Sequence, residues 1–261
     1  MNRKINRLFI LALVISAAFA ACNGGGTKEA ANTTADSTGT AKTDTVQQAP
    51  QDTTPDAVKA APNLYKVISD SMGIRVLEAT YKPGDSSAMH SHPDYALYVI
   101  EGGTAEFTGK DGKKMINEMK TGAENIRSAE VHRVKNTGKK TIKVLLVEVN
   151  RPMGTVSNDA AMDATKVAPD EYKLKRDTLG IRILEATYKP GQSSAMHTHP
   201  DNAVYVINGG ASAFTEKDGT KQTHELKTGM SMIAPAGTHS VKNIGKTTTK
   251  VLIVEVNRPA K

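Results

Sequence analysis

The fold is decided by two stretches of sequence, YKVISDSMGIRVLEATYKPGDSSAMHSHPDYALYVIEGG at residues 65–103 and YKLKRDTLGIRILEATYKPGQSSAMHTHPDNAVYVINGG at residues 172–210. The second repeats the first at an offset of 107 residues, and the offset stays constant to VNRP at 149–152 and 256–259. Of the 88 paired positions, 56 are identical, without an insertion. Such a period is too long for a solenoid repeat, so each copy should be a domain of ordinary size.

Each copy has the pattern of an all-β domain. Short runs rich in valine, isoleucine and tyrosine alternate with turn signals such as Lys82-Pro83-Gly84 and Lys110-Asp111-Gly112. Strands at this spacing predict a sandwich or a small barrel, and no stretch has convincing helical periodicity. An immunoglobulin-like sandwich is the competing fold, and the lack of a Cys–Trp–Cys core disfavours it.

The composition excludes several classes of protein. Hydrophobic residues make up 38% of the 261 residues and aromatic residues 4%, with no Trp and a single Cys. These values exclude a polytopic membrane protein, a collagen and a disulfide-rich miniprotein. The formal net charge of +7 falls to +4 when residues 1–21 are left out, and the charges are scattered along the chain. No nucleic-acid partner is therefore expected.

The first 21 residues resemble a signal peptide for export. The basic segment MNRKINR precedes LFILALVISAAFAA, an apolar stretch too short to span a bilayer. Cleavage after Ala18-Phe19-Ala20 would give a soluble periplasmic protein. Ala20-Ala21-Cys22 instead resembles a bacterial lipoprotein box, although Phe19 replaces the usual Leu. That reading is favoured, and it predicts lipidation of Cys22 and an acyl anchor in the cell envelope, facing the periplasm or the cell surface.

Composition and the repeat together predict the domain boundaries. Residues 22–62 contain almost nothing large and apolar, so burial cannot offset the entropy of ordering the backbone. We expect a disordered tether there, rich in Thr, Ala and Asp. The first domain is expected at 63–152, a linker at 153–169 and the second domain at 170–261.

Six of the seven histidines form equivalent pairs across the repeat. In each copy, two histidines stand two residues apart on a predicted strand and so face the same side. A strand about 40 residues later can bring a third beside them. Three imidazoles leave coordination positions open for water or a ligand. The predicted metal ligands are His90, His92 and His132 in the first copy and His197, His199 and His239 in the second, whereas the unpaired His224 is expected on the surface.

The residues around these histidines resemble the two motifs of the cupin superfamily. Gly84-DSSAM-His90-Ser91-His92 and its counterpart from Gly191 match the first half of motif one, which is Gly, five residues and H-x-H. Residues 229–243 contain Pro235-Ala236-Gly237 and match motif two, one residue short between Gly and His. The resemblance covers about two-thirds of the chain. It implies a bicupin of two six-to-eight-stranded antiparallel barrels, each with a metal pocket in its mouth.

The sequence departs from the family pattern in two respects. The glutamate ligand of motif one falls at Ala96 and Ala203, which leaves a three-histidine site that resembles the centre of the superfamily's thiol dioxygenases. Asp94 and Asp201, in the sequence H-x-H-P-D, are expected beside the histidines rather than on the metal. In addition, the first copy has Ser128-Ala129-Glu130 where the second has the Pro-x-Gly turn, which on loop geometry favours the second site.

Three functions remain open at this point. The chain resembles an envelope-anchored bicupin that binds a divalent ion (Fe, Mn or Zn) and a small-molecule ligand. The alternatives are a metal-dependent enzyme of dioxygenase or isomerase type and a structural protein with relic sites. The missing Glu ligand and the lack of an obvious general base favour binding, and no residue is assigned a catalytic role. A homodimer is left open. The strand glutamates Glu78, Glu148, Glu185 and Glu255 could line a pocket or face solvent, and the solvent-facing position is favoured.

Overall fold

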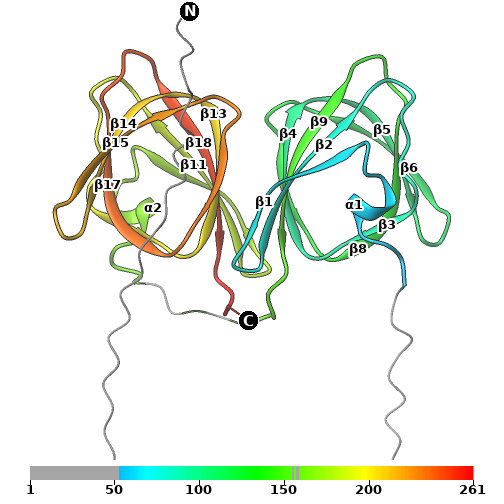
Figure 1. Cartoon of the computed structure of the whole chain (residues 1–261), viewed down its shortest axis with the longest axis horizontal. Coiled ribbons are helices and arrows are strands. Elements are labelled where there is room, and N and C mark those ends of the chain that lie inside the picture. The colour runs from blue at the N-terminus through cyan, green and yellow to red at the C-terminus, as the bar shows by residue number, and fades with distance from the viewer. Residues whose placement is uncertain (1–52, 155, 157–158, 261) are drawn as a thin grey trace, which may run out of the picture. The chain divides into compact units, whose positions relative to one another are not determined.

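The computed structural model describes residues 53–154, 156 and 159–260. Within them, nearly all regular structure is β, with nine strands in each of two units. Figure 1 shows the two units. The predicted all-β class and tandem arrangement are confirmed, with one more strand per unit than the upper limit expected. The signal segment, Cys22 and the tether up to residue 52 lie outside the described residues. No helix in the described part is long and apolar enough to cross a membrane.

The first unit, called barrel 1, consists of two antiparallel sheets that curve around a common interior. The strand order is β1-β2-β9-β4-β7 in one sheet and β3-β8-β5-β6 in the other. The strands are β1 (Tyr65–Ser71), β2 (Ile74–Tyr81), β3 (His90–His92), β4 (Tyr95–Glu101), β5 (Gly103–Gly109), β6 (Lys114–Met119), β7 (Glu124–Arg127), β8 (Glu130–Asn136) and β9 (Ile142–Val149).

The second unit, called barrel 2, repeats this topology strand for strand. Its sheets have the orders β10-β11-β18-β13-β16 and β12-β17-β14-β15. The register is preserved as well, since Ile74 pairs with Val149 in barrel 1 and Ile181 pairs with Val256 in barrel 2. The strands are β10 (Tyr172–Thr178), β11 (Ile181–Tyr188), β12 (His197–His199), β13 (Asn202–Asn208), β14 (Gly210–Glu216), β15 (Lys221–Leu226), β16 (Ser231–Ala234), β17 (Gly237–Asn243) and β18 (Thr249–Val256).

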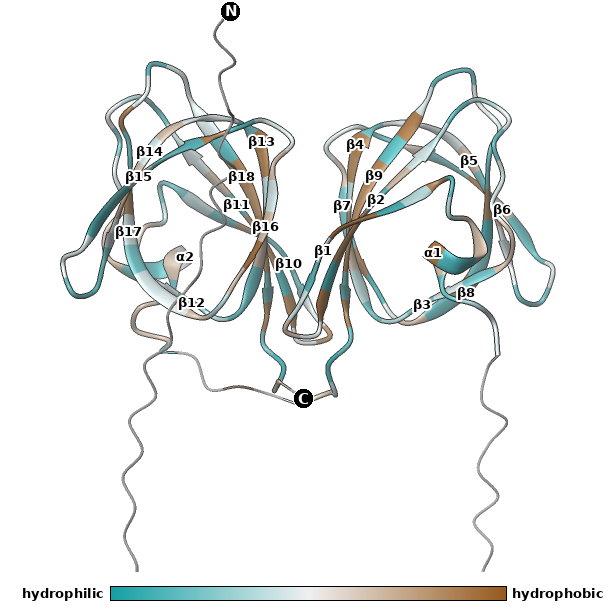
Figure 2. Ribbon diagram, viewed as in Figure 1, coloured by the Kyte–Doolittle hydropathy of each residue, from teal (hydrophilic) through white to brown (hydrophobic). Residues whose placement is uncertain are grey.

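The long central strands are buried on both faces. In β2, Leu77 and Ala79 pack inside barrel 1, whereas Ile74 and Val76 on the opposite face join a cluster that also contains Ile181 of barrel 2. Successive side chains of a strand alternate between the two faces of a sheet, so one strand can serve both clusters. Figure 2 shows hydrophobic segments along these strands of both barrels. The barrels therefore share an apolar interface in addition to their separate interiors.

Two buried arginines reinforce this interface. Arg151, at the end of barrel 1, donates from Nη2 to Asp201 Oδ2 at 2.6 Å, and Arg258, at the end of barrel 2, donates to Asp94 Oδ2 at 2.6 Å. Each arginine also donates to the backbone carbonyl of the other. Reciprocal contacts of this kind are what a two-fold relation between like units produces.

Ordered structure begins earlier than the sequence predicts. Helix α1 (Ala57–Ala60) lies within the expected tether, and helix α2 (Ala164–Val167) lies within the expected linker. Ala57 is fully buried in the core of barrel 1, and the N-cap Asp56 contacts Arg75. The tether prediction is therefore wrong for residues 53–62, because small alanines pack closely without the large apolar side chains that signal a core. The repeat itself carried the signal, since DAVKAAPNLYK at 56–66 aligns with DATKVAPDEYK at 163–173.

Candidate metal centres

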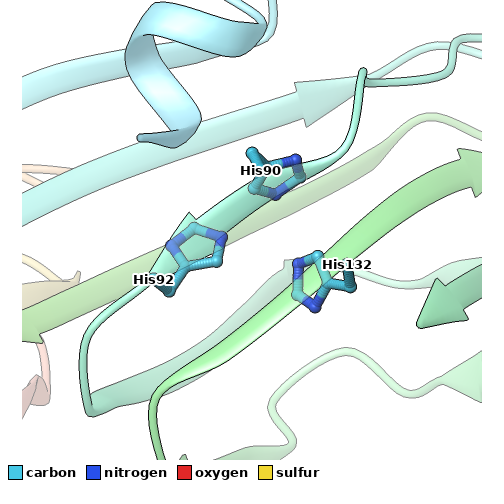
Figure 3. Close-up of side chains that lie close together, drawn as sticks. All are labelled: His90, His92 and His132. Atoms are coloured by element: carbon cyan, nitrogen blue, oxygen red, sulfur yellow. The ribbon is translucent and has the colours of Figure 1, made fainter. Parts of the chain in front are cut away.

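The three histidines of barrel 1 lie on one face of two paired strands. His90 and His92 come from β3, and His132 comes from β8, where it stands directly opposite His90. Figure 3 shows the three rings gathered on one side of these strands. One ring nitrogen from each histidine lies within 4.8 Å of the others. The structure thus brings together the three residues that the sequence predicts, and His90 and His92 share a face because they are two residues apart.

Barrel 2 builds the same group in the same register. His197 of β12 stands opposite His239 of β17, and His199 completes the set, again with one nitrogen from each ring within 4.8 Å of the others. The loss of the Pro-x-Gly turn in barrel 1 leaves this pairing unchanged. In both barrels an aspartate fixes the turn, because Asp94 accepts from Ala129 N and Asp201 accepts from Ala236 N, each at 2.7 Å.

Hydrogen bonds at Nδ1 fix the orientation of the two H-x-H histidine rings in each barrel. His90 Nδ1 lies 2.8 Å from the carbonyl oxygen of Ala88, which can only accept, so this nitrogen carries the proton. His92 Nδ1 donates to Glu148 Oε1 at 2.6 Å. The equivalent bonds in barrel 2 join His197 to Ala195 at 2.7 Å and His199 to Glu255 at 2.7 Å. In all four rings the basic nitrogen is therefore Nε2, as in histidines that bind a metal through that atom.

A divalent ion fits these groups because they leave buried nitrogens unsatisfied. His92 Nε2 and His199 Nε2 are both buried, and neither has a hydrogen-bond partner in the described structure. A buried polar atom without a partner is costly, so native proteins rarely leave one unexplained. Neutral imidazole nitrogens are ligands for Zn, Fe and Mn ions, and three of them leave part of the coordination sphere open.

Glu148 and Glu255 are fully buried, so the expectation that they face solvent is wrong. Glu148 accepts from Arg75 Nε at 2.6 Å as well as from His92. The counterpart Glu255 lies 3.0 Å from Arg182 Nη1. These strand positions look amphipathic in the sequence, but the inner face of the strand places them under the histidines. Each arginine neutralises the buried carboxylate, which can then hold the histidine ring in place.

A tyrosine beside each histidine group was not singled out by sequence reasoning. Tyr65 OH donates to His90 Nε2 at 3.0 Å and accepts from Tyr81 OH at 2.9 Å. Burial and the neighbouring Tyr81 raise the pKa of Tyr65 well above its usual value, so the phenol stays protonated. Barrel 2 has the same chain of contacts, with 2.8 Å between Tyr172 OH and His197 Nε2 and 2.9 Å between Tyr188 OH and Tyr172 OH. The sequence feature that could have identified this residue is a tyrosine 25 residues before the first histidine in both copies.

Burial favours the neutral form of the histidines. It lowers the pKa of His90 and of His197 to about 4, and that of His239 to about 3. Repulsion from the neighbouring imidazoles adds to the effect. Only a neutral imidazole can ligate a metal, so these rings keep the form that binds an ion well below neutral pH.

The remaining predicted positions lie away from the rings. Asp94 and Asp201 bind the interface arginines and the turn before β8 or β17, and no hydrogen bond joins either one to a histidine within the described residues. Ala96 and Ala203 belong to the cluster between the barrels, on the face of the strand that points away from the interior. Exposed His224 contacts the ring of Phe214.

Barrel 1 contains a cavity of about 50 Å³ beside its histidines. His92, His132, Tyr65 and Arg127 supply polar groups to its lining, and side chains such as Leu97 make the rest apolar. One water needs roughly 10–15 Å³ on this measure, so the cavity has room for about three to five waters or a ligand of similar size.

This fold and site define a protein of two similar β-barrels, each with a buried three-histidine group. The family model described as "Cupin domain" matches residues 77–148 and 184–255, more than half of the chain. The chain therefore belongs to the cupin family and carries two tandem cupin domains. No curated protein sequence matches it.

Solved structures with a similar fold share little sequence with this chain. AerE from Microcystis aeruginosa has a TM-score of 0.53 at 13% identity, over 74% of this chain and 91% of that one. The oxalate decarboxylase of Bacillus subtilis, studied for its Mn(II) centres, has a TM-score of 0.53 at 16% identity over 78% and 72%. The oxalate decarboxylase of Lactobacillus farciminis, in a formate complex, has a TM-score of 0.50 at 15% identity over 72% and 78%. At these identities the likeness shows the fold alone.

Proposed function

We propose that each barrel binds one divalent metal ion through its three histidines and presents that ion to a small-molecule ligand inside the barrel. The observation that carries this proposal is the orphaned, buried Nε2 of His92 and of His199, aimed into a group of three imidazoles. Fe, Mn and Zn are the candidate ions, and the Mn(II) centres of the Bacillus subtilis protein make Mn the first to test.

The charge of the site indicates the class of ligand. Three neutral imidazoles leave the +2 charge of an ion uncompensated, so the bound ion would attract an anionic or oxygen-donor ligand. The protonated Tyr65 OH, 3.0 Å from His90 Nε2, can turn its hydrogen toward such a ligand. The cavity of about 50 Å³ limits this ligand to a few heavy atoms unless the barrel opens. A small carboxylic acid meets these conditions.

An enzymatic role of dioxygenase or isomerase type is the second candidate, and the tyrosine pair favours it. Tyr81 donates to Tyr65, which donates to His90, so a chain of hydroxyls can supply a proton at the site. When bound, the ion would supply Lewis-acid or redox chemistry. Turnover of oxalate or another small carboxylate by the metal-loaded protein would support this candidate, whereas binding without turnover supports the first.

Metal analysis tests the proposal directly. The native protein, purified without a His tag or chelator, is expected to hold Mn, Fe or Zn, and up to two ions per chain once metal is supplied in excess. Replacement of His197 and His199 by alanine should remove the ion of barrel 2 and leave that of barrel 1, because each group binds independently. His224→Ala is the matched control, since this exposed histidine belongs to neither group. Measurement by elemental analysis and circular dichroism separates loss of metal from loss of fold. Metal content that survives alanine at all six grouped histidines would refute the proposal.

We further propose that Cys22 carries a lipid that anchors the protein in the cell envelope. The support is a lone cysteine directly after an apolar segment and before Asn23-Gly24-Gly25-Gly26. Cys22→Ser should shift the protein from the membrane fraction to the soluble periplasmic fraction, as followed by immunoblotting. A wild-type protein that is already soluble and begins at Ala21 would support ordinary signal-peptide cleavage instead.

A further inference from the structure

The two histidine groups differ in the residue that pairs with the second histidine of the H-x-H strand. In barrel 1, the paired strands β3 and β8 place His90 opposite His132 and His92 opposite Glu130, so four polar side chains form a rectangle. In barrel 2, the residue opposite His199 is Gly237. The inner face of barrel 1 therefore carries a carboxylate that barrel 2 lacks.

Glu130 is held in place by three hydrogen bonds from two side chains. Its Oε1 accepts from Tyr95 OH at 2.5 Å and from Arg127 Nε at 2.8 Å, and its Oε2 accepts from Arg127 Nη2 at 2.7 Å. His132 Nδ1 lies 3.3 Å from the same Oε1. The carboxylate is thus anchored from one side and faces the third histidine of the group from the other.

Glu130 and both side chains that hold it are replaced in barrel 2, whereas the histidine is kept. Asn202, Ala234 and Gly237 occupy the positions of Tyr95, Arg127 and Glu130. Among the described residues, no carboxylate lies within ion-pair distance of His239, the counterpart of His132. His239 is therefore oriented by packing alone, for example against Phe214, whose ring centroid lies 5.7 Å from its own.

We propose that Glu130 positions His132 and thereby makes the two centres unequal, so that barrel 1 holds its divalent ion more tightly than barrel 2. This inference rests on the proposed function. A carboxylate at the Nδ1 of a ligating histidine fixes the ring and makes its Nε2 a better donor, and loss of such a partner typically costs about 10–100-fold in metal affinity. In barrel 1 a carboxylate lies at Nδ1 of two histidines: it accepts a hydrogen bond from His92, and it lies 3.3 Å from His132 without a hydrogen bond in the metal-free structure. In barrel 2 only His199 has such a carboxylate.

This difference predicts tighter metal binding in barrel 1, whereas loop geometry favours the site of barrel 2. The Pro-x-Gly turn of barrel 2 does not change the strand pairing, as the equivalent registers show. The turn does leave the position opposite His199 without a side chain, because it ends in Gly237. The residue that departs from the family pattern in barrel 1 is the same residue that supplies the extra carboxylate.

The test measures Mn²⁺ affinity at each centre separately. Alanine at His197, His199 and His239 isolates barrel 1, and alanine at His90, His92 and His132 isolates barrel 2. The full chain is used in both cases, and circular dichroism confirms the fold. Isothermal titration with Mn²⁺ should give an affinity about 10–100-fold higher for barrel 1. In the full chain that keeps only the histidine group of barrel 1, Glu130→Gly should remove this higher affinity, and Glu130→Asp should restore part of it.

A transplant into barrel 2 provides the reciprocal measurement. The β-carbon of a residue at position 237 would meet only Pro235 O at 3.8 Å, and the backbone there is not left-handed, so a side chain is accommodated. Gly237→Glu together with Asn202→Tyr and Ala234→Arg should raise the Mn²⁺ affinity of barrel 2 toward that of barrel 1. The electron paramagnetic resonance signal of Mn²⁺ bound in barrel 2 should also change toward that of barrel 1. A loss of stability alone would not produce this change.

The outcomes separate this inference from the proposed function. Binding at both centres with equal affinity, unchanged by Glu130→Gly, would overturn the role of Glu130 and leave the metal function standing. Tighter binding at barrel 2 would also overturn it. Absence of Mn²⁺, Fe²⁺ and Zn²⁺ binding at either centre of the wild-type chain would overturn the function and the inference together.

Discussion

Replacement of Glu148 by alanine is expected to lower the free energy of unfolding by about 3–5 kcal/mol, the cost of breaking a buried ion pair by removing one partner. Glu148 is fully buried and is shared by Arg75 and His92. Without it, the Arg75 guanidinium loses a fully buried counter-ion and the His92 ring loses the acceptor that fixes its orientation. Urea denaturation of the metal-free protein, followed by circular dichroism, measures the change.

The repeat and the neighbouring strand provide matched controls. Glu255→Ala should have an effect of similar sign, because Glu255 is also buried, accepts from His199 and forms an ion pair with Arg182 at 3.0 Å. No hydrogen bond joins Glu255 to Arg182 in the described structure, so the effect should be somewhat smaller than that of Glu148→Ala. Glu78→Ala should change stability by about 1 kcal/mol or less, since the partly exposed pair of Glu78 with Lys143 is screened by solvent. Equal effects of Glu148→Ala and Glu78→Ala would contradict the buried role assigned to Glu148.

Acidification should destabilise the metal-free protein. Burial lowers the pKa of His90 and His197 to about 4 and that of His239 to about 3, against about 6.5 in an unfolded chain. The unfolded state therefore binds more protons below pH 6.5, so this stability is fully present above about pH 6.5 and is lost as the pH falls toward 4. At about pH 5 the expected loss is roughly 2 kcal/mol for each of these histidines.

Urea denaturation near pH 7.5 and near pH 5, with chelator present, measures this loss. The variant with His197→Gln and His239→Gln should lose less stability between the two values, because neither glutamine takes up a proton. His224→Gln should leave the loss unchanged, since this side chain is exposed. Added Mn²⁺ should reduce the loss, because metal and protons compete for the same nitrogens. Equal stability of the wild-type protein at both pH values would contradict the prediction.

The sequence alone was sufficient for the features that depend on local pattern. A gapless offset of 107 residues requires equal strands and equal loops in both copies, and the structure has them in the same register. The spacing of His90 and His92 places both on one face, because the side-chain period of a strand is two. The motif framework then indicated which later histidine completes each group.

The sequence could not predict which partners the strands bring to those histidines. Glu148 lies 56 residues from His92, and Tyr65 lies 25 residues from His90, and nothing local distinguishes them from solvent-facing residues. Glu130 is adjacent to the motif and Arg127 lies three residues before it, but Tyr95, which donates to Glu130, lies 35 residues away. Such contacts depend on strand order and on the curvature of the sheets.

The burial of the outer sheet faces, which point away from each barrel's interior, also depends on the tertiary structure. Ile74 and Val76 alternate with the residues of the interior, so the sequence identifies two apolar faces but not what covers the second one. The tertiary structure covers it with the other barrel, and Arg151 and Arg258 cross between the two to reach Asp201 and Asp94. The sequence by itself determined the repeat, the strands and the two histidine groups, because these follow from spacing along the chain. Only the tertiary structure decided the charges, hydroxyls and packing around each group, because these come from residues that meet only when distant strands pair.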